Sequence, residues 1–120
     1  MMELIKDLPD HVVGVVAKGR ITSGDYDKVL IPAVDAALKR HPKVRMLYCI
    51  EGFDGIDPSA AWEDLKVGME HFTRWERIAV VTDVEWLRHT MNAFGFLMPG
   101  KVRVYDGSER AAAQEWLLRE

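Results

Sequence analysis

Acidic and hydroxyl side chains gather in two stretches that we expect to follow β-strands. The residues concerned are Glu51, Asp54, Asp57 and Ser59 in the first stretch, and Thr82 and Asp83 in the second. Side chains at the carboxyl ends of parallel strands commonly form ligand sites, and oxygen ligands suit hard cations. One interpretation is therefore a site for a cation or a polar ligand, built from Asp54, Asp57, Ser59 and Asp83. The simpler interpretation, which we favour, is that Asp57 and Asp83 cap helices while the other side chains are solvated.

Residue types that supply nucleophiles and metal ligands are few, and their spacing is unfavourable. The histidines are His11, His41, His71 and His89, and no two of them lie four residues apart on one helix face. Cys49 falls in an apolar run, where we expect it to be buried with a raised pKa. The chain has no Gly-x-Ser-x-Gly elbow and no glycine-rich phosphate loop. We therefore expect no catalytic residues, no metal and no cofactor, and we predict that the protein is not an enzyme.

An apolar run from Phe94 to Pro99 joins a predicted helix to a predicted strand, where polar turns are usual. One interpretation is a contact surface for a second subunit, a partner protein or a lipid-like ligand. The alternative is that the helix continues through Leu97 and packs against the sheet. Side chains of the preceding helix would line the other wall of such a groove. The candidate binding residues are Trp62, Met69, Trp86, Met91, Phe94, Phe96 and Leu97.

Composition places few limits on function beyond excluding some partners. The chain has 120 residues, 48% of them hydrophobic and 29% charged, with a net charge of -3. This length predicts one domain over residues 1–120. No basic block is present to follow a phosphate backbone, so we do not expect a nucleic-acid partner. With one cysteine, no signal peptide and no apolar run of about 18 residues, we expect a cytoplasmic protein without a transmembrane segment.

The pattern of apolar and turn residues predicts the element order ββαβαβαβα. We expect strands over residues 2–6, 11–17, 44–50, 77–82 and 101–105, and helices opening near Thr22 or Ser23, at Pro58, at Val84 and after Ser108. Pro32 either kinks the first helix or begins its main part. Strands separated by helices pair in parallel, and the first hairpin adds one antiparallel edge strand. The fold class is therefore α/β, with a mixed, mostly parallel five-stranded sheet and four helices.

The second helix is expected to run from Pro58 to about Arg74 and to bury one apolar stripe. That stripe comprises Ala61, Leu65, Gly68 and Phe72, with Trp62 and Met69 at its edge. In the last helix, Ala113, Trp116 and Leu117 share a face that we expect to be buried.

Several segments, in their order and spacing, resemble the SpoIIAA-like family of the STAS and Sec14-type group. They are Gly19-Arg20-Ile21-Thr22 with Asp25-Tyr26, Pro32, Phe53 with Gly55, Arg77–Asp83 followed by Trp86, Val102–Tyr105, and the closing Ala113, Trp116 and Leu117. The resemblance covers nearly the whole chain. It implies a fold of about five strands and four helices, in agreement with the pattern above.

The resemblance also implies a class of function. Well-known relatives antagonise anti-sigma factors and are regulated by phosphorylation of a serine in an Asp-Ser-Ser-Gly context. The corresponding loop here, residues 55–61, contains Ser59 but lacks that motif, so we do not transfer the phosphorylation switch. We therefore expect a non-enzymatic regulatory or protein-interaction module that binds a protein partner or self-associates. The alternative is a carrier or sensor of a small hydrophobic or lipid-like ligand.

Overall fold

Five strands form one mixed sheet in the order β1-β2-β3-β4-β5. The computed structural model describes residues 1–94 and 100–119, and of Phe72 and Phe94 it describes the backbone alone. The strands are β1 (Met2–Leu4), β2 (Val12–Ile21), β3 (Val44–Ile56), β4 (Trp75–Val81) and β5 (Lys101–Tyr105). β1 pairs antiparallel with β2, and the other neighbours pair in parallel. The predicted α/β class and the antiparallel edge strand are confirmed.

The first helical segment is continuous from residue 23 to residue 40 but changes its winding. It comprises α1 (Ser23–Asp25), the π-helical η1 (Tyr26–Leu30) and α2 (Ile31–Arg40). Thr22 caps it, because the Thr22 and Asp25 side chains each accept a hydrogen bond from the backbone N–H of the other. Pro32 lies in the first turn of α2, where its missing N–H costs least. The second of the two alternatives for Pro32 therefore holds.

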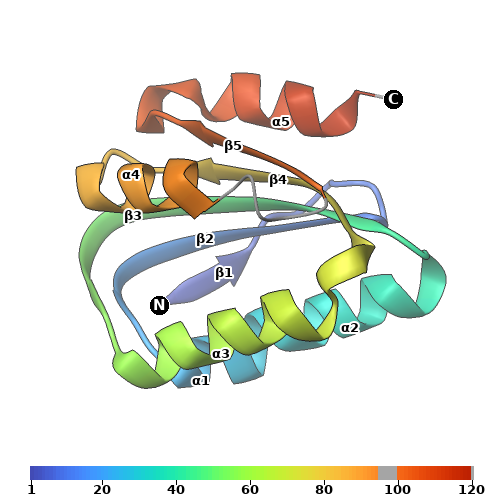
Figure 1. Cartoon of the computed structure of the whole chain (residues 1–120), viewed down its shortest axis with the longest axis horizontal. Helices are drawn as coiled ribbons and strands as arrows, with labels where there is room; N and C mark the ends of the chain where they lie inside the picture. The colour runs from blue at the N-terminus through green and yellow to red at the C-terminus, as the bar shows by residue number, and fades with distance from the viewer. Residues whose placement is uncertain (95–99, 120) are drawn as a thin grey trace.

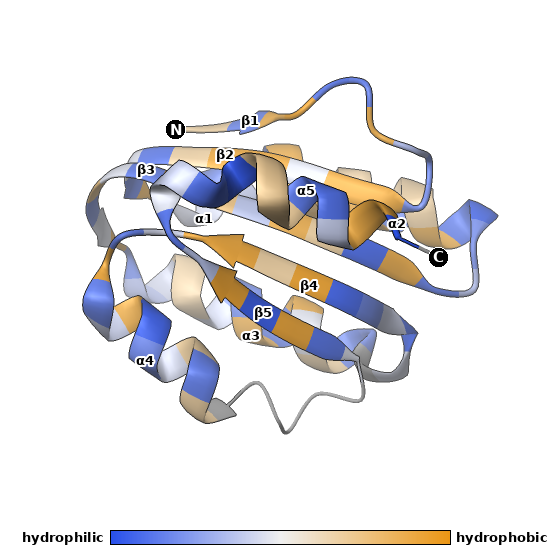
Figure 2. Cartoon of the chain, turned by 90° about the horizontal axis from the view of Figure 1, so that it is seen from above, coloured by the Kyte–Doolittle hydropathy of each residue, from blue (hydrophilic) through white to orange (hydrophobic). Residues whose placement is uncertain are grey.

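The remaining helices are α3 (Pro58–Glu70), the 3-10 turn η2 (Phe72–Arg74), α4 (Glu85–Phe94), the 3-10 turn η4 (Gly107–Glu109) and α5 (Arg110–Leu118). Figure 1 shows α2 and α3 on one side of the sheet and α5 on the other. α4 lies beside β5, at the edge of the sheet (Figure 2). The second helix is shorter than predicted, because α3 ends at Glu70. Arg74 then donates hydrogen bonds to the backbone carbonyls of Leu38, His41 and Pro42.

Two apolar clusters, one on each face of the sheet, make up the core. The first gathers side chains of the first helical segment, α3 and the sheet, with Tyr26, Leu30 and Val34 almost fully buried. The second contains Leu47, Cys49, Ala79 and Val81 of the sheet together with Ala113, Trp116 and Leu117 of α5. The predicted buried face of the last helix is therefore confirmed.

β2 and β3 run further than the sequence indicates. Residues 51–56, which we expected to form a loop, continue β3, and Ile56 is still paired with Ile21. The extension includes glycines in the left-handed region, with φ of 64° at Gly19 and 53° at Gly52, and the register shifts next to Gly19. Pairing with β2 keeps residues 51–56 extended, although their own glycine and aspartate residues favour a turn.

Two arginines of the sheet anchor the end of α5. Arg45 is 8% exposed, and its Nη1 donates to the carbonyl oxygens of Leu117 and Arg119, both at 2.5 Å. Its Nε donates to Glu76 Oε1 at 2.5 Å. Arg77 Nη1 donates to the Arg119 oxygen at 2.9 Å. The cations thus satisfy carbonyls that the end of a helix leaves unpaired.

Candidate functional site

The outward face of α3 carries its large apolar side chains. Trp62 is 60% exposed, Leu65 51% and Met69 67%, whereas the buried residues of the helix are the smaller Ala60 and Val67. A surface helix normally does the reverse and buries its largest apolar residues. We call Trp62, Leu65 and Met69 the α3 surface.

The predicted buried stripe of this helix is wrong. Ala61 and Leu65 are exposed and Gly68 is half-buried, while of Phe72, the fourth member, only the backbone is described. The physical reason lies on the inner side of the helix, where Asp64 Oδ1 accepts a hydrogen bond of 2.8 Å from the Tyr26 hydroxyl. Together with the buried Ala60 and Val67, this bond holds the inner side of α3 against the rest of the fold, and Leu65 faces outward.

Asp64 belongs to a buried network of two hydroxyls and one carboxyl. The hydroxyl oxygens of Tyr26 and Tyr48 are 2.9 Å apart, and both tyrosines are buried. Burial raises the pKa of each phenol, and the nearby Asp64 charge raises it further. Asp64 is exposed as a residue, but its carboxyl group lies among protein atoms, and this burial raises its pKa. The phenols stay protonated at neutral pH and act here as structural hydrogen-bond donors. Sequence patterns missed this network, because Tyr26 and Asp64 are 38 residues apart.

Trp86 on α4 adds a further exposed aromatic side chain. It is 54% exposed, and its ring packs edge-on against Phe53 of β3, with the ring centroids 6.0 Å apart. Met91 is half-buried, and none of the α4 side chains that are described is fully buried. The other predicted contact residues, namely the Phe94 side chain, Phe96 and Leu97, lie outside the described part of the chain. Their role as a contact surface stays a prediction.

The four residues of the candidate polar loop site occupy separate surroundings. Asp57 is the residue preceding α3, but its side chain makes no cap hydrogen bond and its Oδ1 lies 2.5 Å from Arg20 Nε. Asp83 Oδ1 accepts a hydrogen bond of 2.8 Å from the backbone N–H of Gly107, in place of the cap we expected on α4. Asp54 and Ser59 are exposed. No hydrogen bond or ion pair joins any two of the four, all of which the structure describes.

Gly55, near the end of β3, lies next to Arg20. Gly55 has a φ of 109°, and a Cβ on it would lie 2.9 Å from Arg20 Nη1. The requirement for glycine therefore comes mainly from this backbone conformation, which other residues rarely adopt, since the flexible Arg20 guanidinium could move aside. Arg20, Gly55 and Asp57 form a structural clamp between the ends of β2 and β3.

The described residues whose side chains could bind a metal ion do not gather into one group. Within residues 1–94 and 100–119, no three His, Cys, Asp or Glu side chains are grouped so as to hold a metal ion. Cys49 is buried as predicted, and burial raises the pKa of its thiol.

Comparison with known proteins identifies the family. The family model described as SpoIIAA-like matches residues 12–118. The chain therefore belongs to the SpoIIAA-like family, and the resemblance inferred from its sequence is confirmed. No curated protein matches the chain.

A solved structure supports the same fold. It is the crystal structure of an uncharacterised protein with a SpoIIAA-like fold from Shewanella loihica PV-4. The two chains share 25% sequence identity and superpose with a TM-score of 0.77, over 98% of this chain and 92% of the other. As for membranes, none of the helices in the described ranges has both the length and the apolar character needed to cross one.

Proposed function

We propose that the protein is a non-enzymatic regulatory or protein-interaction module that binds a protein partner through the α3 surface. The single observation that carries this proposal is the outward position of Trp62, Leu65 and Met69, each more than half exposed. Isolated apolar residues are ordinary on protein surfaces, but three large ones on one helix face are typical of a contact surface. Tryptophan in particular is enriched among the residues that dominate binding energy.

The surroundings of the titratable groups support a function without catalysis. Asp57 is paired with Arg20, Asp83 holds the backbone of Gly107, and Asp64 accepts from Tyr26. Each of these carboxylates therefore has a structural partner. Carboxylates with such partners stabilise the fold that carries the α3 surface, and this role does not require them to react with a substrate.

Photocrosslinking tests this proposal. A photoreactive phenylalanine analogue replaces Met69, which is 67% exposed, and a matched control carries it in place of the exposed Lys39 on α2. Both proteins are irradiated in a lysate of the source organism, and the adducts are identified by mass spectrometry. We expect one discrete protein adduct from position 69 and none from position 39.

A second variant establishes that the adduct depends on the α3 surface. Trp62→Ser combined with Leu65→Ser removes apolar area from exposed positions, so we expect the fold to persist and the adduct from position 69 to disappear. An adduct that forms equally from position 39, or that survives the double substitution, contradicts the proposal. An adduct with a lipid-like small molecule would instead favour the carrier function.

Self-association is a separate part of the proposal. The sequence predicts it through residues 94–99, and light scattering after size exclusion on the wild type and on Phe96→Asp measures it. A larger mass for the wild type than for the variant supports this contact, and a monomer in both cases contradicts it.

A further inference from the structure

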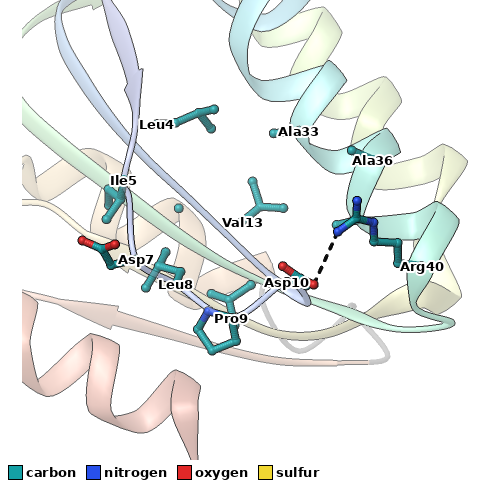
Figure 3. A pocket seen from close by; sticks show the side chains of 13 residues that line it. Leu4, Ile5, Asp7, Leu8, Pro9, Asp10, Val13, Ala33, Ala36 and Arg40 are labelled. Carbon is teal, nitrogen blue, oxygen red and sulfur yellow. Dashed lines mark hydrogen bonds and ion pairs between the residues drawn. The ribbon is translucent and has the colours of Figure 1, made fainter.

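A cavity of about 310 Å³ opens at the β1 edge of the sheet, away from β5 and α4. It lies between α2 and the connection that leads from β1 to β2 (Figure 3). None of the residues discussed above as candidate binding residues lines it. It is therefore a separate feature of the molecule, independent of the proposed function.

Most of the residues that line the cavity are apolar and come from facing elements, while Asp7, Asp10 and Arg40 are charged. On one side α2 contributes the small side chains of Ala33, Ala36 and Ala37. Leu4 and Val13 face them from β1 and β2 (Figure 3). Because the alanines are short, α2 leaves room here that a larger side chain would fill.

The connection between β1 and β2 is held in place by specific contacts. Leu8 packs over Gly14, where a Cβ would approach the Leu8 Cδ1 atom to 2.5 Å. The backbone N–H of Val12 donates to the Pro9 carbonyl oxygen at 2.9 Å, and Asp7 adopts a φ of 66°, which is uncommon for a residue other than glycine. The wall formed by this connection is thus part of the fold.

Two opposite charges close one end of the cavity. Arg40 Nη1 at the end of α2 lies 3.4 Å from Asp10 Oδ2, and their side chains are 70% and 69% exposed. An exposed pair at this distance contributes little to stability, so a ligand can replace either partner at low cost. Figure 3 shows Asp7 pointing away from this pair, so it does not share the charged end.

From this geometry we infer a binding site for a free α-amino acid with an aliphatic side chain. The Arg40 guanidinium binds the ligand carboxylate, the Asp10 carboxylate binds the ligand ammonium, and the apolar side chain enters between α2 and Val13. Charge-assisted hydrogen bonds to both ends of a zwitterion are stronger than neutral ones. A volume near the lower limit of small-molecule sites suits a ligand of this size.

Three related ligands test the proposed recognition in titrations followed by amide NMR spectra of the full chain. The probes are L-leucine, 3-methylbutylamine, which lacks the carboxylate, and 4-methylpentanoate, which lacks the ammonium. We expect saturable shifts with L-leucine at residues lining the cavity, with an affinity in the millimolar range or tighter and about two- to fivefold above that of either analogue. Absence of saturable shifts with L-leucine, or equal affinity for all three compounds, would overturn the inference.

Substitutions at exposed positions test separately how the charged end and the apolar walls of the cavity contribute to binding. Arg40→Gln and Asp10→Asn each remove one charge, and because both groups are exposed we expect each to weaken L-leucine binding about two- to fivefold. Ala36→Leu fills the apolar space and should abolish binding, while Lys39→Gln, a neighbouring exposed change outside the cavity lining, should leave it unaltered. Unchanged binding in Ala36→Leu or in Arg40→Gln would contradict the placement of the ligand.

Discussion

Arg45 stands out among the single residues because it is charged and buried and donates three hydrogen bonds through Nε and Nη1. Its guanidinium contacts Glu76 on one side and the carbonyls of Leu117 and Arg119 on the other. A buried charge is costly unless each of its hydrogen-bonding groups finds a partner. The residue therefore joins β3, β4 and the end of α5 at one point.

Removing this guanidinium should weaken the fold measurably. We expect Arg45→Ala to lower the free energy of unfolding by about 2 to 3 kcal/mol, since it leaves the helix carbonyls and Glu76 without their partner. Arg40→Ala, which breaks only the exposed pair with Asp10, should change it by less than about 0.5 kcal/mol. Urea denaturation measures both, and similar values for the two variants would contradict the role given to Arg45.

Asp64 should give the pH dependence of stability an unusual sign. Burial raises its pKa above the ordinary value of 3.8, although the hydrogen bond from Tyr26 offsets part of this. Between that value and the raised value, the folded state binds more protons than the unfolded state does. The contribution of Asp64 to stability is therefore greatest at low pH and declines as the pH rises through this window.

Asp64→Asn tests this sign. Asparagine keeps an acceptor for the Tyr26 hydroxyl but carries no charge, so the variant should be at least as stable as the wild type at pH 7. The difference between the two should shrink as the pH falls toward the ordinary pKa, as measured by urea denaturation across pH. Asp64→Ala, which removes the acceptor, serves as the control and should be less stable than Asp64→Asn. A difference that does not vary with pH would refute the argument.

At the scale of elements, α3 is set by its partners more than by its own sequence pattern. Its inner side offers Ala60, Val67 and the carboxyl of Asp64, and its outer side offers the α3 surface. The helix thus buries only small apolar side chains against the rest of the fold and leaves its larger ones exposed. These exposed side chains, the α3 surface, are the basis of the proposed function.

Two glycines, one in α3 and one before β5, should respond oppositely to the same substitution. A Cβ on Gly68 meets no atom within 4 Å, so Gly68→Ala should stabilise the protein by about 0.5 to 1 kcal/mol through helix propensity. A Cβ on Gly100 would lie 2.3 Å from the Trp75 carbonyl oxygen, so Gly100→Ala should destabilise it by about 2 kcal/mol or more. Thermal denaturation compares them, and a loss of stability in both would show that α3 is more tightly enclosed than described.

At the scale of the whole molecule, Cys49 is buried between the sheet and α5, so its thiol becomes accessible to a reagent only when the protein unfolds. The side chain is 1% exposed, and burial raises its pKa. We expect a thiol-specific reagent to label the native protein at least about a thousandfold more slowly than the urea-unfolded protein. The labelling rate should rise with urea in parallel with unfolding followed by circular dichroism. Rapid labelling in native buffer would mean that the sheet opens locally around β3.

Much of the architecture was predictable because it depends on local patterns. A run rich in β-branched residues predicted β2, a capping residue at Thr22 or Ser23 predicted the first helix, and the shared face of Trp116 and Leu117 predicted the packing of α5. The candidate site was less predictable. Which side of α3 faces outward depends on tertiary contacts, among them a hydrogen bond between residues 38 positions apart.

Thus the sequence alone determined the order of the elements and the mixed, mostly parallel sheet, because periodicity and turn residues act over a few neighbouring positions. The resemblance of several segments to known proteins indicated the family. The tertiary structure decided the length of β3, which side of α3 faces outward, and the partners of Asp57 and Asp83. The extension of β3 depends on pairing with β2, and the orientation of α3 depends on contacts such as that between Tyr26 and Asp64. Asp57 bonds to Arg20 across 37 residues and Asp83 to Gly107 across 24. Such contacts form only when the chain is folded, and so no local pattern encodes them.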